Sequence, residues 1–155
     1  MAAKKAQAVR AADVMSPEVV AIKENDDVWS AIRTLIAYDI TGAPVVGVDG
    51  RLVGVISQTD LVRYLQAKSA KLADFYSDSE PDVRLPSNGR SVLVRDLMTR
   101  RIVRADEDDS LDKISRIMLV QKVHRVIITR AERLVGIVTT MDVLRAAQHF
   151  GEQAA

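Results

Sequence analysis

Apolar residues recur along the chain in two patterns, one typical of short strands and one typical of amphipathic helices. A short apolar run at 19–22 predicts a strand, and an acidic stretch at 25–27 then supplies the cap and first turn of a helix. The next apolar residues follow the spacing of one helix face. They are Val28, Ile32, Leu35 and Ile36. The pattern therefore predicts a strand followed by a helix packed on one side.

A predicted hairpin and a second helix complete this unit. Apolar runs at 44–48 and 51–56 flank Asp49-Gly50, a pair that favours a two-residue type I′ turn with positive φ. After the hairpin, three apolar residues again have helical spacing, Leu61, Val62 and Leu65. The order is β-α-β-β-α, and the long apolar strands indicate that both faces of the sheet need cover.

The same pattern occurs twice. Residues 11–22 align with 94–105, and residues 51–65 align with 133–147. The two alignments differ in offset by one residue, and this difference falls at the hairpin turn, where a deletion is tolerated. The sequence therefore predicts an α/β (α+β) protein of tandem β-α-β-β-α repeats. A unit of about 55 residues buries little surface alone, so we expect two copies to pack together through their small sheets with pseudo-twofold symmetry.

The predicted organisation has five parts. They are an N-terminal tail at 1–10, a first repeat at 11–66, a linker at 67–92, a second repeat at 93–150 and a C-terminal tail at 151–155. The linker holds Pro81, Pro86 and Asn88-Gly89, which are loop signals. Its start, through Ala73, can prolong the preceding helix, and the remainder fits either a solvated tether or a lid.

Composition excludes several functional classes. The 155 residues include 48% hydrophobic and 28% charged residues, which is enough for a packed core. The net charge of +1 gives no electrostatic basis for binding nucleic acid or an anionic membrane, and aromatic residues, at 4%, are too few for a base-stacking surface. Cysteine is absent and only two histidines are present, so we expect no metal site. No apolar run suits a signal peptide or a membrane span, and we expect a cytoplasmic protein.

One short motif with possible chemistry ends each hairpin. Ser57 precedes Asp60 by three residues, and Thr139 precedes Asp142 by the same spacing, as in a helix capping box. A second interpretation uses the same geometry, because a carboxylate at a helix start can accept both hydroxyls of a ribose. On that interpretation Gly54, just upstream, lets a ligand approach the backbone. Residues alone leave both interpretations open.

Both copies resemble CBS domains, and the pair resembles a Bateman module. The resemblance rests on Asp13-Val14-Met15-Ser16-Pro17 and Asp96-Leu97-Met98-Thr99, on 40–46 and 123–128, and on the Gly-x-x-[Ser/Thr]-x-x-Asp runs at 54–60 and 136–142. The second copy departs from the family pattern at Arg100 and Ile127, where the first has Pro17 and Pro44. The resemblance covers nearly all of the chain except the tails and the linker.

The resemblance implies two clefts between the repeats, each of which takes an adenine nucleotide or S-adenosylmethionine. Each cleft would take its ribose-binding carboxylate from one repeat and its adenine-lining residues from the other. One cleft would use Thr139, Asp142, Asp26, Ala31, Ile40, Thr41 and Gly42. The other would use Ser57, Asp60, Asp109, Ile114, Val123, His124 and Arg125, although Ile114, which replaces Ala31 of the other copy, adds bulk there.

Basic residues near these motifs are candidate phosphate contacts. The stretch at 122–125 resembles the Lys-Ile-His-Arg stretch that meets phosphates in γ subunits of the AMP-activated kinase, so His124 and Arg125 are implied to bind an anion. Arg63 and Arg145 follow the two ribose carboxylates by three residues and can reach a phosphate. Exposed surface arginine and histidine are the alternative in each case.

Three functional classes follow. The first is a regulatory module that senses AMP, ADP, ATP or S-adenosylmethionine, requires no other cofactor, and signals as a homodimer to an effector protein. The second is a scaffold in which the motifs are only helix caps. The third is an enzyme. The sequence has no nucleophile, Walker or metal-triad spacing that would support this class, so we expect no catalytic residues. The helix edge of Trp29, Arg33 and Ile36 is either a subunit interface or a half-exposed part of the core.

Overall fold

The computed structural model describes residues 8–66 and 91–154, which divide into two compact units. Among the described residues, unit 1 comprises 8–19, 50–52 and 102–154, and unit 2 comprises 20–49, 53–66 and 91–101. The predicted tether or lid lies outside the described residues, apart from its last two positions. The units do not coincide with the sequence repeats. The first residues of each repeat belong to the unit that contains most of the other repeat.

Unit 2 contains a three-stranded sheet in the order β1-β2-β3. Its elements are β1 (Ile22–Lys23), α2 (Val28–Ala37), β2 (Gly42–Val46), β3 (Leu52–Ser57), a helix from 58 described through 66, and the short α4 (Val94–Leu97). The pairing of β1 with β2 is parallel and sets Ile22 opposite Val45. Both residues are buried, which places the core of this unit against the sheet.

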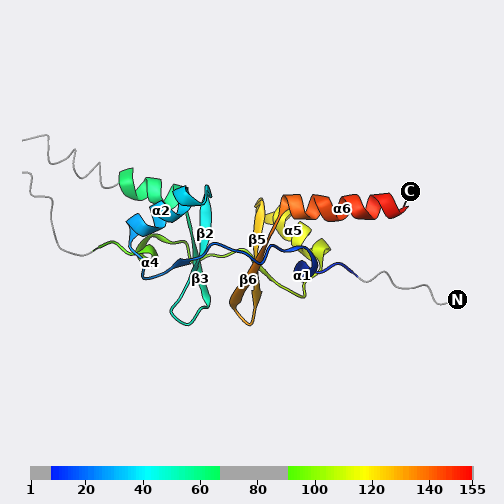
Figure 1. The fold of residues 1–155 in the computed structure, drawn as a ribbon, viewed down its shortest axis with the longest axis horizontal. Coiled ribbons are helices and arrows are strands. Elements are labelled where there is room, and N and C mark those ends of the chain that lie inside the picture. Colours follow the sequence, from blue (N-terminus) through cyan, green and yellow to red (C-terminus); the bar gives the residue numbers. More distant parts are fainter. Residues whose placement is uncertain (1–7, 67–90, 155) are drawn as a thin grey trace, which may run out of the picture. The chain divides into compact units, whose positions relative to one another are not determined.

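Unit 1 repeats this plan with a sheet in the order β4-β5-β6 (Figure 1). Its elements are α1 (Ala11–Val14), β4 (Arg104–Asp106), α5 (Leu111–Gln121), β5 (Arg125–Arg130), β6 (Arg133–Thr139) and α6 (Thr140–Ala154). The pairing of β4 with β5 is parallel, and that of β5 with β6 is antiparallel, as a strand-helix-strand crossover followed by a hairpin requires. The helices α5 and α6 pack on each other and on this sheet.

Each unit has its own apolar core. In unit 2 the core joins the sheet to α2 and α4, and its fully buried members include Val28, Val45, Ile56 and Val94. In unit 1 the core joins the sheet to α1 and α5, and its fully buried members include Ala11, Ile114, Val126, Ile128 and Val138. The predicted β-α-β-β-α order is thus confirmed in both copies, as a mixed fold with two small sheets.

The helix that follows the first strand of each unit, α2 or α5, begins and ends in the same way in both units. Asp27 caps α2 by accepting hydrogen bonds from the amides of Trp29 and Ser30, and Ser110 caps α5 by accepting one from Lys113. Each helix is followed by a residue with positive φ, Asp39 at 50° and Lys122 at 54°. This left-handed residue ends the helix and turns the chain into the next strand.

The prediction of a type I′ turn at Asp49-Gly50 is wrong. Five residues, 47–51, separate β2 from β3, and within them only Gly50 has a positive φ, of 77°. The two-residue turn occurs in the other copy, where Arg130 pairs with Arg133 and both intervening residues, Ala131 and Glu132, have positive φ. The first copy has one more residue here than the second, which accounts for one of the three additional loop residues. Asp-Gly alone does not fix the loop length.

Candidate functional site

A strand-to-helix turn in each unit carries the hydroxyl and carboxylate that the sequence singles out. In unit 2 the Oδ2 atom of Asp60 accepts hydrogen bonds from the amide of Ser57 at 2.9 Å and from its hydroxyl at 2.8 Å. The amide of Asp60 donates back to the Ser57 hydroxyl at 3.4 Å. This reciprocal arrangement is the capping box that the spacing predicts, and it fixes the carboxylate at the helix start.

The equivalent turn of unit 1 has the same geometry. The Oδ2 atom of Asp142 accepts from the amide and from the hydroxyl of Thr139, both at 2.8 Å, and the amide of Asp142 donates to that hydroxyl at 3.4 Å. The second carboxylate oxygen, Oδ1, lies 3.4 Å from the Nη1 atom of Arg145. The side chain of Asp142 is only 11% exposed, so this carboxylate is held rigidly and partly shielded from water.

Backbone hydrogen bonds set the chain neighbours of each turn. The amide of Gln58 donates to the carbonyl of Thr41 at 2.9 Å in unit 2, and the amide of Thr140 donates to the carbonyl of His124 at 3.1 Å in unit 1. Thr41 therefore lies beside the Asp60 turn, and His124 beside the Asp142 turn. The resemblance had assigned each of these residues to the other carboxylate, and that assignment stays a prediction.

The glycine upstream of each turn has a structural explanation. A Cβ atom on Gly54 would lie 2.6 Å from the Sδ atom of Met98 and 3.0 Å from the carbonyl oxygen of Thr99. On Gly136 it would lie 2.5 Å from the Sδ atom of Met15 and 3.1 Å from the carbonyl oxygen of Ser16. The space that we assigned to an approaching ligand is thus filled by the chain itself.

Two further predicted contacts, Asp26 and Asp109, close equivalent turns after the first strand of each unit. Asp26 accepts from the amide of Lys23 at 3.2 Å, and Asp109 accepts from the amide of Asp106 at 2.9 Å. Asp109 also accepts from the Nζ atom of Lys113 at 2.7 Å, and this hydrogen bond lowers the pKa of its carboxyl group. Both carboxylates are therefore already engaged by their own units.

The remaining predicted site residues differ in their exposure. Ala31 and Ile114 are both fully buried in the cores of their units, so the described packing leaves them no surface. Ile40 and Val123 are partly buried against those cores. Five of the predicted site residues are exposed, and they are Thr41, His124, Arg125, Arg63 and Arg145. Gly42 is half-buried. A Cβ atom added at this position would lie 3.0 Å from the carbonyl oxygen of Ile56.

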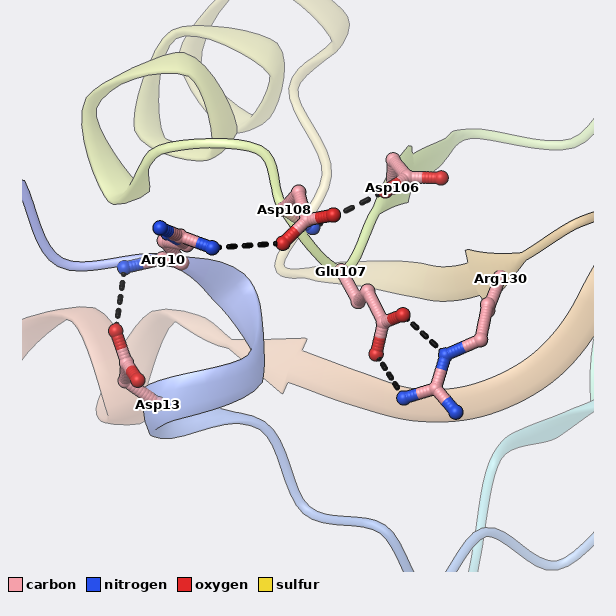
Figure 2. A network of polar contacts seen from close by, with 6 residues as sticks. All are labelled: Arg10, Asp13, Asp106, Glu107, Asp108 and Arg130. Atoms are coloured by element: carbon pink, nitrogen blue, oxygen red, sulfur yellow. Dashed lines mark hydrogen bonds and ion pairs between the residues drawn. The ribbon is translucent and has the colours of Figure 1, made fainter.

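An acidic loop at 106–109 joins β4 to α5 and forms a network with two arginines (Figure 2). Glu107 accepts two hydrogen bonds from Arg130, and Arg10 donates from Nη1 to Asp108 at 2.9 Å. The amide of Asp108 donates to Asp106 at 3.1 Å. The bonds from Arg130 hold the pKa of the Glu107 carboxyl group below its ordinary value of 4.5. Two of the four carboxylates of this stretch are thus paired with arginines of unit 1, and Asp109 is paired with Lys113.

Acidification is expected to weaken the fold through this loop. A carboxyl group whose pKa is lowered by folding stabilises the folded state fully above its unfolded pKa, and this contribution disappears as the pH falls through the folded pKa. For Glu107 the loss therefore begins below about pH 4.5, and the lowered pKa values of Asp27 and Asp109 act in the same direction from about pH 3.8. Urea unfolding at neutral pH and at about pH 3 measures the loss.

The control for this expectation is Glu107→Gln, which removes the titrating group but keeps its size. We expect its free energy of unfolding to be lower than that of the unaltered chain at neutral pH and to fall less on acidification. An equal fall in both proteins would show that Glu107 does not contribute to acid sensitivity.

Within 8–66 and 91–154, no group of three or more metal-ligating side chains is arranged to hold a metal ion. In the same part of the chain, no helix is long and apolar enough to cross a membrane.

Comparisons with known proteins agree on one family. The model of the CBS domain matches the chain twice, at residues 11–67 and 94–149. CBSX2 of Arabidopsis thaliana, in its crystal structure in complex with AMP, is 27% identical to this chain and has a TM-score of 0.70. The match covers 92% of this chain and 98% of the CBSX2 chain. The cytosolic domain of the Mg²⁺ channel MgtE in complex with ATP is 27% identical, with a TM-score of 0.65, over 89% of this chain and 48% of that one.

A curated relative shows the same segment inside an enzyme. Inosine-5′-monophosphate dehydrogenase of Methanocaldococcus jannaschii is 30% identical over 145 residues, which are 92% of this chain and 25% of that protein. The chain thus spans about a quarter of the dehydrogenase. The similarity covers a CBS-type segment and leaves three quarters of the enzyme unmatched.

Proposed function

The chain belongs to the CBS domain family, and from this premise we propose that it is a regulatory module that binds an adenosine-containing ligand. The observation that carries the proposal is the fixed carboxylate of each strand-to-helix turn. In both turns the Oδ2 atom is held by the preceding hydroxyl and amide, which orients Oδ1. Among the described residues, Oδ1 of Asp60 has no partner and Oδ1 of Asp142 has only the long contact to Arg145. An oriented carboxylate oxygen is a strong acceptor for a ribose hydroxyl.

The two turns differ in charge, and this difference favours unit 1 for a phosphate-bearing ligand. Arg145 follows Asp142 by one helical turn, as exposed Arg63 follows Asp60, so the difference lies before and at the start of the middle strand. Exposed His124 directly precedes β5 and exposed Arg125 is its first residue, next to the Asp142 turn. At the equivalent places of unit 2 the chain has Thr41 and Gly42, which carry no charge. Guanidinium groups bind phosphate in two-point contacts, so we propose AMP, ADP or ATP at the Asp142 turn. The Asp60 turn suits an uncharged or cationic adenosyl compound such as S-adenosylmethionine.

The solved relatives support the ligand class. CBSX2, a CBS-pair protein, holds AMP, and the cytosolic domain of MgtE holds ATP, and each is 27% identical to this chain. We propose that the ligand acts by binding one conformation of a homodimer more tightly than another, because only such a difference in affinity shifts an equilibrium. An effector protein then reads the change, and the module itself catalyses no reaction.

Thermal unfolding against AMP, ADP, ATP and S-adenosylmethionine tests the proposal. A ligand at about 100 times its dissociation constant stabilises the folded state by about 2.7 kcal/mol, which raises the Tm by several degrees. We expect Asp142→Ala to abolish the shift from a nucleotide, and Asp60→Ala to abolish the shift from S-adenosylmethionine. Asp27→Ala is the matched control, because it also removes a helix-capping carboxylate, at a site outside both turns.

Two results would contradict the proposal. One is the absence of a shift with any adenosine compound at millimolar concentration, and the other is a shift that both turn variants retain. Either result would favour the second candidate function, a ligand-free scaffold. That candidate has one observation in its favour, since the capping boxes alone account for Ser57, Asp60, Thr139 and Asp142.

A further inference from the structure

A short segment of the chain lies against the last strand of each unit. In unit 1, Ser16 pairs with Ile137 of β6 through two backbone hydrogen bonds, at 2.9 and 3.1 Å, and the side chain of Met15 lies on the bare backbone of Gly136. In unit 2, Thr99 pairs with Val55 of β3 through two bonds of 2.9 Å, and Met98 lies on Gly54. Each methionine thus occupies the space that a glycine leaves open.

The residues before these methionines are also held alike. Ala11 is fully buried in unit 1, and its amide donates to the carbonyl of Asp109 at 2.9 Å. Val94 is fully buried in unit 2, and its amide donates to the carbonyl of Asp26 at 2.9 Å. The next amide in each segment bonds to the loop that follows the unit's first strand. These contacts are Ala12 to Glu107 and Arg95 to Glu24, both at 3.0 Å.

We call the receiving surface of each unit its segment groove. In unit 1 it consists of the carbonyls of Glu107 and Asp109 and the backbone of Gly136 and Ile137. In unit 2 it consists of the carbonyls of Glu24 and Asp26 and the backbone of Gly54 and Val55. Most contacts are to backbone atoms, and both occupants share the pattern apolar-x-Asp-hydrophobic-Met-[Ser/Thr], with Ala11 or Val94 in first place. The grooves therefore recognise one type of peptide.

The origin of each occupant is unexpected from the sequence order. Residues 11–16 begin the first repeat, yet they belong to the unit built mainly from 102–155. Residues 94–99 begin the second repeat, yet they belong to the unit built from 20–49 and 53–101. A repeat therefore does not fill its own groove. The groove of each unit holds the first segment of the other repeat, and that segment has the same sequence pattern as the repeat's own first segment.

We propose that the two segment grooves are peptide-docking sites of one specificity, and that each accepts its segment from a second copy of the chain as well as from its own. Nothing in a groove distinguishes the two sources, because the same hydrogen bonds and the same methionine contact form in either case. Exchange of an identical element between copies costs little free energy for that reason. The partner that fits this surface is thus a second copy of the chain, joined by its segment.

Cysteine cross-linking tests the exchange, because the chain has no cysteine of its own. Residues that exchange two hydrogen bonds in an antiparallel pair lie about 5.5 Å apart at Cα, within the range of a disulfide. Ser16→Cys and Ile137→Cys are made in separate full-length chains, mixed, unfolded in urea, refolded together at high protein concentration and oxidised. We expect a disulfide-linked heterodimer whose fraction rises with protein concentration.

The controls separate docking from random collision. The Ser16→Cys chain mixed with Leu119→Cys, an exposed position on α5 that contacts no segment, gives the background. We expect the first mixture to exceed it on the order of tenfold, because docking holds the two sulfurs at a high effective concentration. The double variant Ser16→Cys/Ile137→Cys shows that the geometry permits the bond within one chain.

One outcome overturns the proposal. The double variant would form its internal disulfide, while the mixture of single variants would give no more heterodimer than the Leu119→Cys background. The pair Thr99→Cys and Val55→Cys repeats the test in unit 2, and it decides the result if a variant of unit 1 does not refold.

Discussion

Replacing Gly136 with alanine is expected to lower the free energy of unfolding by about 1–3 kcal/mol, the usual cost of overpacking a tight contact. The new Cβ atom would lie 2.5 Å from the Sδ atom of Met15 and 3.1 Å from the carbonyl oxygen of Ser16. The methionine can rotate away, but the carbonyl belongs to a hydrogen-bonded pair with Ile137 and cannot move without breaking it. Urea unfolding monitored by circular dichroism measures the loss.

A double-mutant cycle identifies the contact responsible. Met15→Ala removes the sulfur from the glycine, so Gly136→Ala should cost less in the Met15→Ala background than in the unaltered chain. The same cycle with Gly54 and Met98 is expected to behave alike. Gly47→Ala is the control, because the only close atoms there are the ends of side chains and its backbone has no positive φ. Equal costs in both backgrounds would show that the methionine contact does not explain the glycine.

Replacing Ile114 with alanine is expected to lower the free energy of unfolding by about 2–5 kcal/mol, because it leaves a cavity in a closed core. Ile114 is fully buried on α5 and belongs to the core of unit 1. The control on the same helix is Leu119→Ala, at a side chain that is 78% exposed. We expect that change to stay within about 0.5 kcal/mol. Chemical unfolding of both variants compares them directly.

The Ile114 result also bears on the sequence comparison between the copies. The equivalent residue of unit 2 is Ala31, which is equally buried, so the two cores fill the same position with side chains of different size. A small loss at Ile114 would show that the surrounding residues collapse into the space that the side chain leaves. In that case the bulk of Ile114 would be dispensable for folding.

Local patterns predicted the elements that depend on neighbours in sequence. Helical spacing located α2 and α5, and the three-residue spacing of Ser57 with Asp60 predicted the capping box that the structure contains. These features arise because the interacting residues lie within one or two turns of each other. The first strand was placed too early, at 19–22, whereas β1 spans Ile22–Lys23.

Features that depend on distant parts of the chain were missed. The short helices α1 and α4 were not predicted, because four residues give no readable helical period. Gly54 was interpreted as a space for a ligand, since the sequence does not show that Met98 lies on it. One signal was available, because the same Asp-hydrophobic-Met pattern and the same glycine both occur twice. Two features that duplicate together are candidates for contact with each other.

The division into units has a consequence for synthesis on the ribosome. The described residues of unit 2 all lie between 20 and 101, so all of them have been made by the time Arg101 emerges. Unit 1 combines residues 8–19 with residues 102–154, and Ala11 must wait for its partner Asp109 and for the strand that contains Ile137. Since chains fold as their residues emerge, unit 2 can close first, while the segment around Ala11 stays undocked until the rest of unit 1 has been made.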